Sequence, residues 1–265
     1  MYLEKNQKYL VRSKIILSNY DKSKHSKINN FLESKIGEVI HKKGYFVSMK
    51  NYDVVFKVYL LNDIIIFCVL LSCVNRSLFQ IRKPDKKPFF SPGVIIPQLA
   101  RFICNIARIK EKSIVLDPFC GTCGLLIESL YLGSYSIGID VQEKILNGAK
   151  KNIEYYNNIN IWSNNYDLLF CNAKNLPFPN NFFDSIVTDL PYGHSTIIEG
   201  NSKEELFLHS FLEMYRVLKF DCYAVIVYSK IISNLLSNVK FKIIKIYTQR
   251  VHKSLTRYIH LVQKK

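Results

Sequence analysis

The chain has 265 residues, and 48% of them are hydrophobic, so it can bury the core of one large domain or of two ordinary ones. Its seven cysteines are an odd, scattered set, mostly within apolar runs, which favours reduced thiols over a disulfide framework. The N-terminus has no signal-peptide pattern, and the longest apolar run, residues 64–74, is too short to span a bilayer. We therefore expect a cytoplasmic protein that has no membrane partner.

The net charge of +16 is distributed unevenly along the chain. Residues 1–92 carry 17 basic and 7 acidic side chains, residues 93–221 carry 11 and 14, and residues 222–265 carry 9 and none. Two basic ends around a nearly neutral middle favour a ligand-binding core flanked by surfaces for a polyanion. The alternative is that the chain is simply rich in lysine and that these side chains only face solvent.

The first part of the chain predicts a small α+β domain, which we place at residues 1–80. Its expected elements are a strand at 8–17, a helix at 27–44 that ends at Gly44, and a hairpin over 53–71 that turns at Asn62 and Asp63. Residues 81–92 contain three prolines and no periodicity, so we expect a linker there.

Residues 93–265 predict a second domain in which short apolar strands alternate with helices. We expect strands at 113–117, 136–140, 166–171, 184–189, 223–229, 239–249 and 256–263, and helices at 97–109, 124–133, 142–156 and 203–219. This alternation predicts a mainly parallel sheet covered by helices on both faces. The fold class is therefore α/β: a doubly wound sheet with a small N-terminal α+β domain.

The loop after the first of these strands predicts a cofactor site, because ligands bind beyond the carboxyl ends of strands in such sheets. Asp117 ends the strand, and Gly121 and Gly124 allow a close backbone approach before the next helix. Asp140 ends the second strand, where a carboxylate accepts the hydroxyls of a ribose. Dinucleotide and phosphate-loop fingerprints are missing, and an acidic loop suits the amino group of a methionine moiety, so we expect S-adenosylmethionine. The alternative is an unrelated α/β turn.

Two thiols, Cys120 and Cys123, form a Cys-x-x-Cys pair inside this loop. Redox chemistry needs an exposed first thiol, and a zinc site needs two more ligands, but no second Cys-x-x-Cys or paired histidine follows. We therefore expect neither a redox role nor a metal site.

The residues after the fourth strand predict a site for methyl transfer to an exocyclic amine. Asp189 and a backbone carbonyl beside Pro191 can accept the amine hydrogens, and Tyr192 offers a flat face on which a flipped base stacks. The alternative is a proline turn capped by the aspartate. After the third strand, Asn172 and the backbone of Ala173 can bind an adenine ring, or they form an ordinary Asn turn.

With these motifs in view, the chain resembles the archaeal THUMP-domain tRNA guanine-N2 methyltransferases that modify guanine-10. The resemblance covers about residues 8–265 and rests on KPFFSPGVIIPQLAR, DPFCGTCG, GID, NAKNLPF, DLPYG and VHKSLTRYI. It implies a Rossmann-like methyltransferase domain after a THUMP-like RNA-binding domain, with S-adenosylmethionine as cofactor and tRNA as substrate and partner. One or two methyl groups are compatible with it.

The resemblance also implies a role for each matched residue. The residues implied to bind or enclose the cofactor are Phe90, Ser91, Pro92, Asp117, Phe119, Gly121, Thr122, Gly124, Asp140, Asn172 and Ala173. Those implied to hold the guanine are Asp189, Pro191 and Tyr192, and those implied to lie near the RNA are His252, Lys253, Ser254, Thr256 and Arg257. In that last group, Lys253 and Arg257 are the expected phosphate ligands, and the alternative is a basic, solvated strand end.

Three departures from the family pattern qualify these expectations. Asn172 stands where the family commonly has aspartate, and Cys123 replaces a glycine, which we expect to be tolerated. Family members usually carry a ferredoxin-like segment before the THUMP core, whereas this chain begins almost at the core, which leaves open whether a partner subunit or a simpler contact mode gauges the tRNA acceptor stem. The remaining alternatives are methylation of another tRNA or rRNA base or of DNA adenine, and a non-catalytic RNA-binding subunit.

Overall fold

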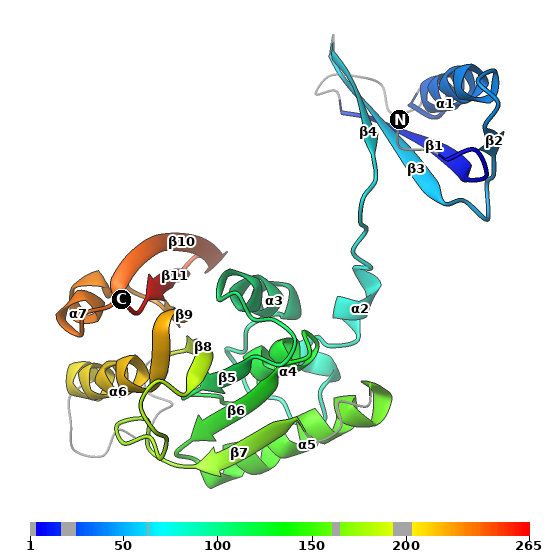
Figure 1. The fold of residues 1–265 in the computed structure, drawn as a ribbon. Coiled ribbons are helices and arrows are strands. Elements are labelled where there is room, and N and C mark those ends of the chain that lie inside the picture. Colours follow the sequence, from blue (N-terminus) through cyan, green and yellow to red (C-terminus); the bar gives the residue numbers. More distant parts are fainter. Residues whose placement is uncertain (1–3, 17–24, 63, 161–164, 193–202) are drawn as a thin grey trace. The chain divides into compact units, whose positions relative to one another are not determined.

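The computed structural model describes the chain except for residues 1–3, 17–24, 63, 161–164 and 193–202 (Figure 1). The contacts divide the chain into two units, Met1–Asn75 and Arg76–Lys265, which are described separately below. None of the helices in the described part of the chain is both long and apolar enough to cross a membrane.

The N-terminal unit is a four-stranded sheet with one long helix. Its elements are β1 (Lys8–Ile15), α1 (His25–His41), β2 (Phe46–Val47), β3 (Val54–Leu61) and β4 (Ile64–Val69), and the strand order is β2-β1-β3-β4. Tyr9 and Phe56 from the sheet form the core together with Ile36 and Ile40 of α1. The predicted strand, helix and antiparallel hairpin are confirmed, although Asp63 of the expected turn lies outside the described residues. The two-residue β2 is too short to show a sequence pattern.

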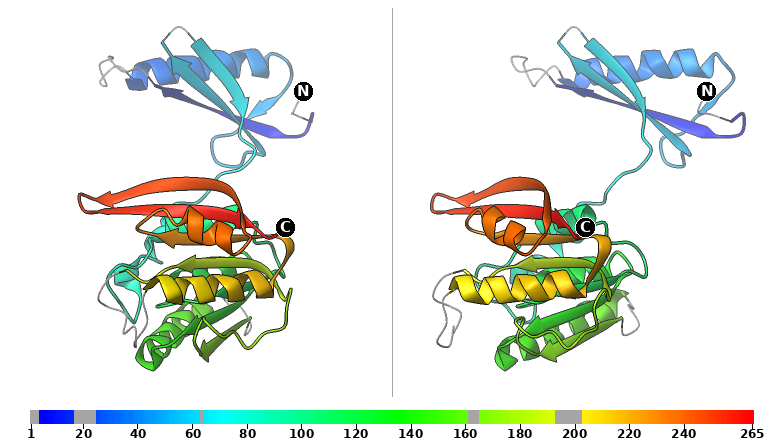
Figure 2. Two further views of the ribbon diagram at one scale, coloured as in Figure 1. Left: turned by 90° about the vertical axis from the view of Figure 1, so that its left-hand side faces the viewer. Right: turned by 60° about the vertical axis from the view of Figure 1, so that its left-hand side comes forward.

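The C-terminal unit is built on a seven-stranded sheet. Its elements are α2 (Ser77–Gln80), the 3-10 helix η2 (Pro84–Lys86), α3 (Pro97–Ile106), β5 (Ile114–Asp117), α4 (Gly124–Leu130), β6 (Tyr135–Asp140), α5 (Glu143–Asn160), β7 (Tyr166–Phe170), β8 (Phe183–Asp189), α6 (Lys203–Val217), β9 (Leu218–Tyr228), α7 (Ser233–Asn238), β10 (Lys242–His252) and β11 (Leu255–Gln263). The strand order is β10-β11-β9-β8-β5-β6-β7. Strands β7, β6, β5, β8 and β9 are parallel, and the β10–β11 pair is antiparallel and forms one edge (Figure 2).

Both faces of the central strands of this sheet are buried, as the apolar runs predict. Val115 and Val187 pack with α3 on one face, whereas their chain neighbours Leu116 and Ile186 pack in another cluster with α6. This alternation follows from the two-residue period of a strand. The predicted doubly wound α/β fold is confirmed.

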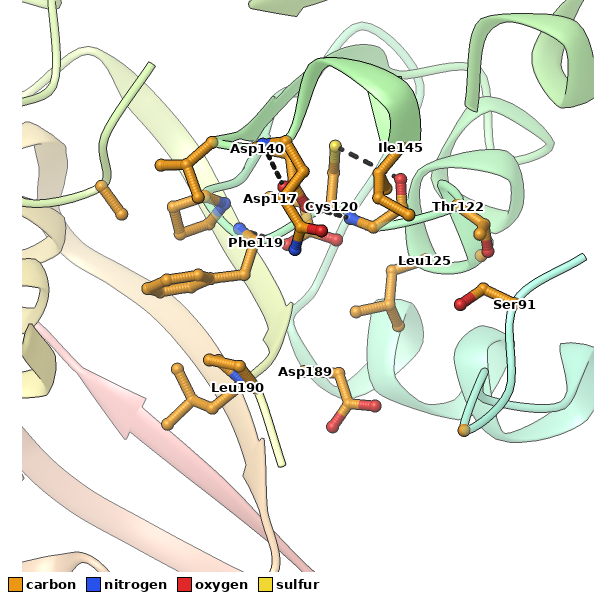
Figure 3. A pocket seen from close by; sticks show the side chains of 18 of the residues that line it. Ser91, Asp117, Phe119, Cys120, Thr122, Leu125, Asp140, Ile145, Asp189 and Leu190 are labelled. Atoms are coloured by element: carbon orange, nitrogen blue, oxygen red, sulfur yellow. Dashed lines mark hydrogen bonds between the residues drawn. The ribbon is translucent and has the colours of Figure 1, made fainter. Parts of the chain in front are cut away.

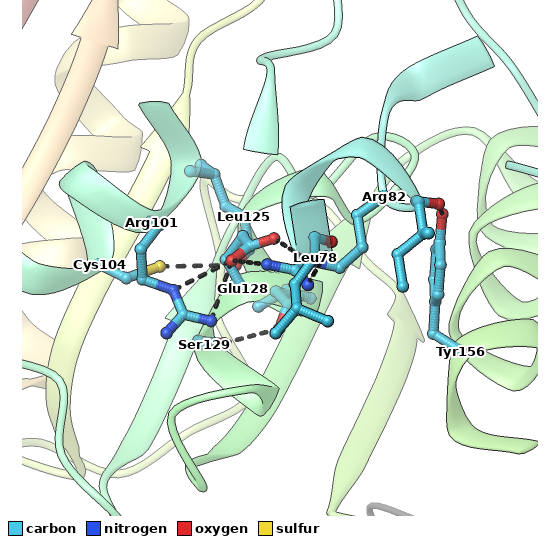
Figure 4. Close-up of polar contacts among 10 residues, drawn as sticks. Leu78, Arg82, Arg101, Cys104, Leu125, Glu128, Ser129 and Tyr156 are labelled. Atoms are coloured by element: carbon cyan, nitrogen blue, oxygen red, sulfur yellow. Dashed lines mark hydrogen bonds and ion pairs between the residues drawn. The ribbon is translucent and has the colours of Figure 1, made fainter. Parts of the chain in front are cut away.

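The segment before α3, residues 76–96, is hereafter called the joining segment, and it belongs to the C-terminal unit. Arg82 is buried and donates from Nε to Glu128 Oε1 of α4 at 2.6 Å (Figure 4). Tyr156 of α5 donates its hydroxyl to Ile81 O at 3.0 Å. The expected linker at 81–92 is thus hydrogen-bonded to α4 and α5. It has no helical or strand period, and the buried polar side chains of Arg82 and Tyr156 hold it in place.

Candidate active site

A cavity of about 820 Å³ opens at the carboxyl ends of the parallel strands (Figure 3). Strand β5 lies between β6 and β8, so the chain order reverses there, and such a switch point is where open α/β sheets bind ligands. Asp117 ends β5, Asp140 ends β6 and Asp189 ends β8, and all three line the cavity. Strand geometry therefore brings three acidic residues that are distant in sequence to one place.

The loop between β5 and α4 is held by Asp140. Gly121 N donates to Asp140 Oδ2 at 3.1 Å, and Gln142 N donates to Oδ1 at 2.9 Å. Gly121 has φ of +50°, and a Cβ built on it would meet no atom within 4 Å. A glycine is favoured at this φ, and its backbone faces open space in the cavity wall.

Two carboxyl groups near this loop have raised pKa values. Burial raises the pKa of Asp117 to about 8, and the nearby Asp189 and Asp140 add to the increase. Burial also raises the pKa of Asp140, although its backbone hydrogen bonds oppose the shift. Among the residues that the structure describes, none forms an ion pair with Asp117. A cationic group in the cavity would therefore stabilise the ionised form of Asp117.

The two thiols of the loop are core side chains. Cys120 and Cys123 are free and buried, and they pack with Leu126 and Ile127 of α4. The hydrogen bond with Cys123 and burial raise the pKa of Cys120 well above its ordinary value. A nucleophilic thiol needs the opposite shift, so this geometry does not favour a redox role. Cys123 has φ of +62°, a conformation that favours glycine.

The other side of the cavity is formed by Asp189 and the residues after it. Tyr192 donates its hydroxyl to Asp189 Oδ1, and the Tyr192 ring stacks on Tyr228 with centroids 5.9 Å apart. Burial raises the pKa of Asp189 to about 7, while the Tyr192 hydroxyl and the Arg257 guanidinium oppose the shift. Burial also raises the pKa of Tyr192, so its hydroxyl stays protonated. The site thus holds an acid that titrates near neutral pH beside an aromatic ring.

Arg257 of β11 contacts both Asp189 and the joining segment. Its Nη2 lies 3.9 Å from Asp189 Oδ2 and donates to Gly93 O of the joining segment at 2.7 Å. The residue is only 4% exposed, because β11 places it behind the cavity wall. This differs from our expectation of a phosphate ligand: a buried guanidinium bonded within the protein positions Asp189 and the joining segment.

Most of the expected site residues come together around the cavity. Those that line it are Ser91, Pro92, Asp117, Phe119, Gly121, Thr122, Gly124, Asp140, Asn172, Ala173, Asp189, Pro191 and Tyr192. Phe90 is not in the lining, and 58% of its surface is exposed. Asn172 Oδ1 accepts from Lys174 N at 3.0 Å, so the expected Asn turn is present at a position that also lines the cavity.

The expected RNA-contacting residues lie apart from the cavity lining. His252, Lys253 and Ser254 are exposed at the turn between β10 and β11, and Ser254 Oγ is 3.2 Å from His252 Nδ1. Thr256 is partly buried at the start of β11. Gly193, the last residue of the DLPYG motif, lies outside the described residues.

Sequence reasoning missed the apolar walls of the cavity. Ile145 of α5 and Leu206 of α6 line it, but neither belongs to a motif. Both are ordinary apolar helix positions, and only the packing of the helices brings them to the site. Gln142 and Leu125 could have been found, because each lies within two residues of a motif position.

The sheet order, the acidic ends of β5 and β6, and Asp-Leu-Pro-Tyr after β8 define a Rossmann-like methyltransferase that uses S-adenosylmethionine. The family model of the RMKL-like methyltransferase domain matches residues 84–259. The chain is 33% identical over 234 residues to the tRNA (guanine(10)-N2)-dimethyltransferase of Pyrococcus abyssi, which covers 88% of this chain and 68% of that protein. The chain therefore belongs to the RMKL-like methyltransferase family, within the group of tRNA (guanine(10)-N2)-dimethyltransferases.

A second relative agrees with this assignment, and a solved structure agrees with the fold. The enzyme of the same description from Methanocaldococcus jannaschii is 34% identical over 240 residues, and the match covers 88% of this chain but 64% of that protein. The crystal structure of TrmN from Thermus thermophilus aligns with a TM-score of 0.52 over 98% of this chain and 73% of that chain, at 18% identity. This last likeness concerns the fold alone.

Proposed function

We propose that this protein transfers methyl groups from S-adenosylmethionine to the N2 atom of guanine-10 in tRNA. The observation that carries the proposal is the Asp189–Tyr192 pair, which faces the same cavity as the loop from Asp117 to Gly124. Similarity over 88% of the chain to enzymes named for this reaction supports the choice of base and position.

The residues around the cavity fit the proposed cofactor. Asp117 is a buried acid without a cationic partner among the described residues, and it suits the ammonium of a methionine moiety. Asp140 suits a ribose, and the segment at Asn172 and Ala173 suits an adenine edge. When bound, S-adenosylmethionine supplies a methyl group that is activated by its sulfonium.

The side chains at the other side of the cavity suit the base. The exocyclic amine must lose one proton as its nitrogen gains a methyl group, and the carboxylate of Asp189 can accept it. The carbonyl of Leu190, which precedes Pro191, provides a second acceptor for the amine. We place the base against the ring of Tyr192, which stacks on Tyr228 and has the Arg257 guanidinium 5.8 Å from its centroid. Arg257 also favours the ionised form of Asp189.

We also infer that the N-terminal unit is a THUMP-like domain that binds RNA. Exposed lysines along α1 and just after it support this role: Lys27, Lys35, Lys42 and Lys43. Such lysines bind phosphates by charge, without reading the sequence.

The test uses the purified protein, labelled S-adenosylmethionine and an unmodified tRNA transcript, followed by mass spectrometry of the nucleosides. We expect N2-methylguanosine or its dimethyl form. A matched transcript carrying inosine at position 10 lacks only the N2 amine there, and it should accept no label.

Each contrary outcome points to a different alternative. Equal labelling of the inosine transcript would move the target to another tRNA position. Cofactor binding without any label would point to a missing partner subunit or to another nucleic acid. Absence of cofactor binding would favour a non-catalytic RNA-binding protein.

A further inference from the structure

We propose that Lys87 of the joining segment binds the carboxylate of the cofactor's methionine moiety. The inference rests on the proposed function, and it concerns the first residue of the motif KPFFSPGVIIPQLAR, to which no role was given above. Lys87 directly follows η2 and is partly buried.

The position of the ammonium group is the first argument. Lys87 Nζ lies 3.6 Å from the point that a Cβ on Gly124 would occupy. Gly124 lines the cavity, and so do its neighbours Thr122 and Val94. Lys87 itself is not among the residues that line the cavity. Because Gly124 has no side chain, no Cβ stands between the Lys87 ammonium and the Gly124 backbone.

The absence of an anionic partner is the second argument. In the described part of the chain, no carboxylate forms an ion pair with Lys87. Glu128 is the carboxylate that acts on it electrostatically, but both Glu128 oxygens are already bonded. Arg82 Nε lies 2.6 Å from Oε1, and Arg101 Nε lies 3.0 Å from Oε2 (Figure 4). The region thus holds three cationic side chains and one carboxylate.

The pKa of the Lys87 ammonium agrees with this geometry. Removal from water lowers the pKa of Lys87 to about 8, and the nearby Cys123 and Glu128 oppose the shift only in part. An anion beside the ammonium would restore the charged form, since an opposite charge at short range favours ionisation.

The charges at the two ends of one loop suit a zwitterion. Asp117 at the start of the loop is a buried acid without a cation, and Lys87 beside Gly124 at the end is a cation without an anion. The α-amino acid group of the proposed cofactor carries one ammonium and one carboxylate. Asp117 then takes the ammonium and Lys87 takes the carboxylate. A phosphate ligand fits less well, because Asp117 and Asp140 would repel it.

The test compares Lys87→Met and Lys87→Gln with Lys86→Met, a change at an adjacent lysine that is exposed. Calorimetry measures the Kd of S-adenosylmethionine and of its decarboxylated form, which lacks only the carboxylate. Both Lys87 variants should raise the Kd of S-adenosylmethionine by roughly 10- to 100-fold, the strength of a hydrogen bond to a charged group. The Kd of the decarboxylated compound should stay within about 2-fold of the wild type, as should both values for Lys86→Met.

The outcomes separate this inference from the proposed function. An equal loss for both compounds would make Lys87 a structural residue, and an unchanged Kd would show that it is not a ligand; either result overturns the inference alone. Failure of the wild-type protein to bind S-adenosylmethionine would remove the proposed function and the inference with it. Because Lys87→Gln keeps a polar side chain of similar length, it remains informative if Lys87→Met does not fold.

Discussion

Buried acidic side chains occur in two places around α4, and they differ in whether an ionic partner compensates their charge. Behind the helix, Glu128 is 1% exposed and bonded to Arg82 and Arg101. In the cavity, Asp117 has no ionic partner among the described residues, and Asp189 lies 3.9 Å from one guanidinium. Burial raises the pKa of both cavity acids, to about 8 and about 7.

The difference separates structural charges from functional ones. A buried ion that holds the fold must be paired, because an uncompensated charge costs several kcal/mol. An acid that is buried without a full set of partners destabilises the protein in the absence of a ligand. Such acids are typical of sites where a bound ligand or a reacting group supplies the missing partner. The predictions below test the two sides of this comparison and the uncharged groups beside the cavity.

The largest expected effect concerns Asp189. Asp189→Ala should lower methyl transfer by roughly 10³-fold or more, because the variant has no carboxylate to accept the amine proton. The Kd of S-adenosylmethionine should change by less than about 3-fold, since we place the cofactor against the other loop. Single-turnover transfer and calorimetry measure the two quantities. Loss of both together would make Asp189 a structural residue.

Glu128 should matter for stability. Glu128→Gln leaves two arginines without their carboxylate, one of them fully buried, and should lower the free energy of unfolding by about 3–5 kcal/mol. Urea denaturation measures it. The matched control is Glu154→Gln, which removes a solvent-exposed pair with Lys150 and should cost less than about 1 kcal/mol. Similar values for both variants would contradict the paired role of Glu128.

Tyr192 should affect transfer more than RNA binding. Tyr192→Ala removes a stacking surface worth about 1–3 kcal/mol per base, so transfer should fall roughly 10- to 100-fold. The tRNA Kd should change little, because phosphate contacts dominate affinity. Tyr192→Phe keeps the ring and loses the hydrogen bonds of the hydroxyl with Asp189 and Arg257, so it should retain most of the activity. A filter-binding assay beside the transfer assay distinguishes the two effects.

Arg257 should shift the pH profile. Arg257 lowers the raised pKa of Asp189, so Arg257→Met should raise this pKa further and shrink the anionic fraction at pH 7. The acidic limb of kcat/KM against pH should therefore move to higher pH by roughly one unit. Arg257→Lys keeps the charge and should shift the limb less. A uniform loss of rate with an unchanged pH profile would indicate a purely structural role.

The smallest effect is expected from the thiols. The double change Cys120→Ser and Cys123→Ser replaces two buried side chains of similar size and should leave transfer within about 3-fold of the wild type. The activity of the wild type should not depend on added reductant. Inactivity of a folded double variant would reopen a redox role for this pair.

Much of the fold could be predicted because local patterns and tertiary structure agree. The strands that end at Asp117, Asp140 and Asp189 are short apolar runs, and the helices between them have helical spacing. Helix α7 was missed because its six residues are too few for a period to show. The sequence predicts a linker at 81–92 because no local pattern records its buried anchor: Arg82 is bonded to Glu128, which lies 46 residues further along the chain.

The sequence by itself determined which strand ends carry acids, and therefore where a cofactor and a reacting amine would meet in a parallel sheet. It did so because side chains that follow parallel strands must emerge at the same edge. Only the tertiary structure decided that Arg257 is buried beside Asp189, that Phe90 is exposed and outside the cavity lining, and that the Lys87 ammonium lies beside Gly124. Those placements depend on how segments that are distant in sequence pack together, and a local hydrophobic pattern carries no information about such contacts.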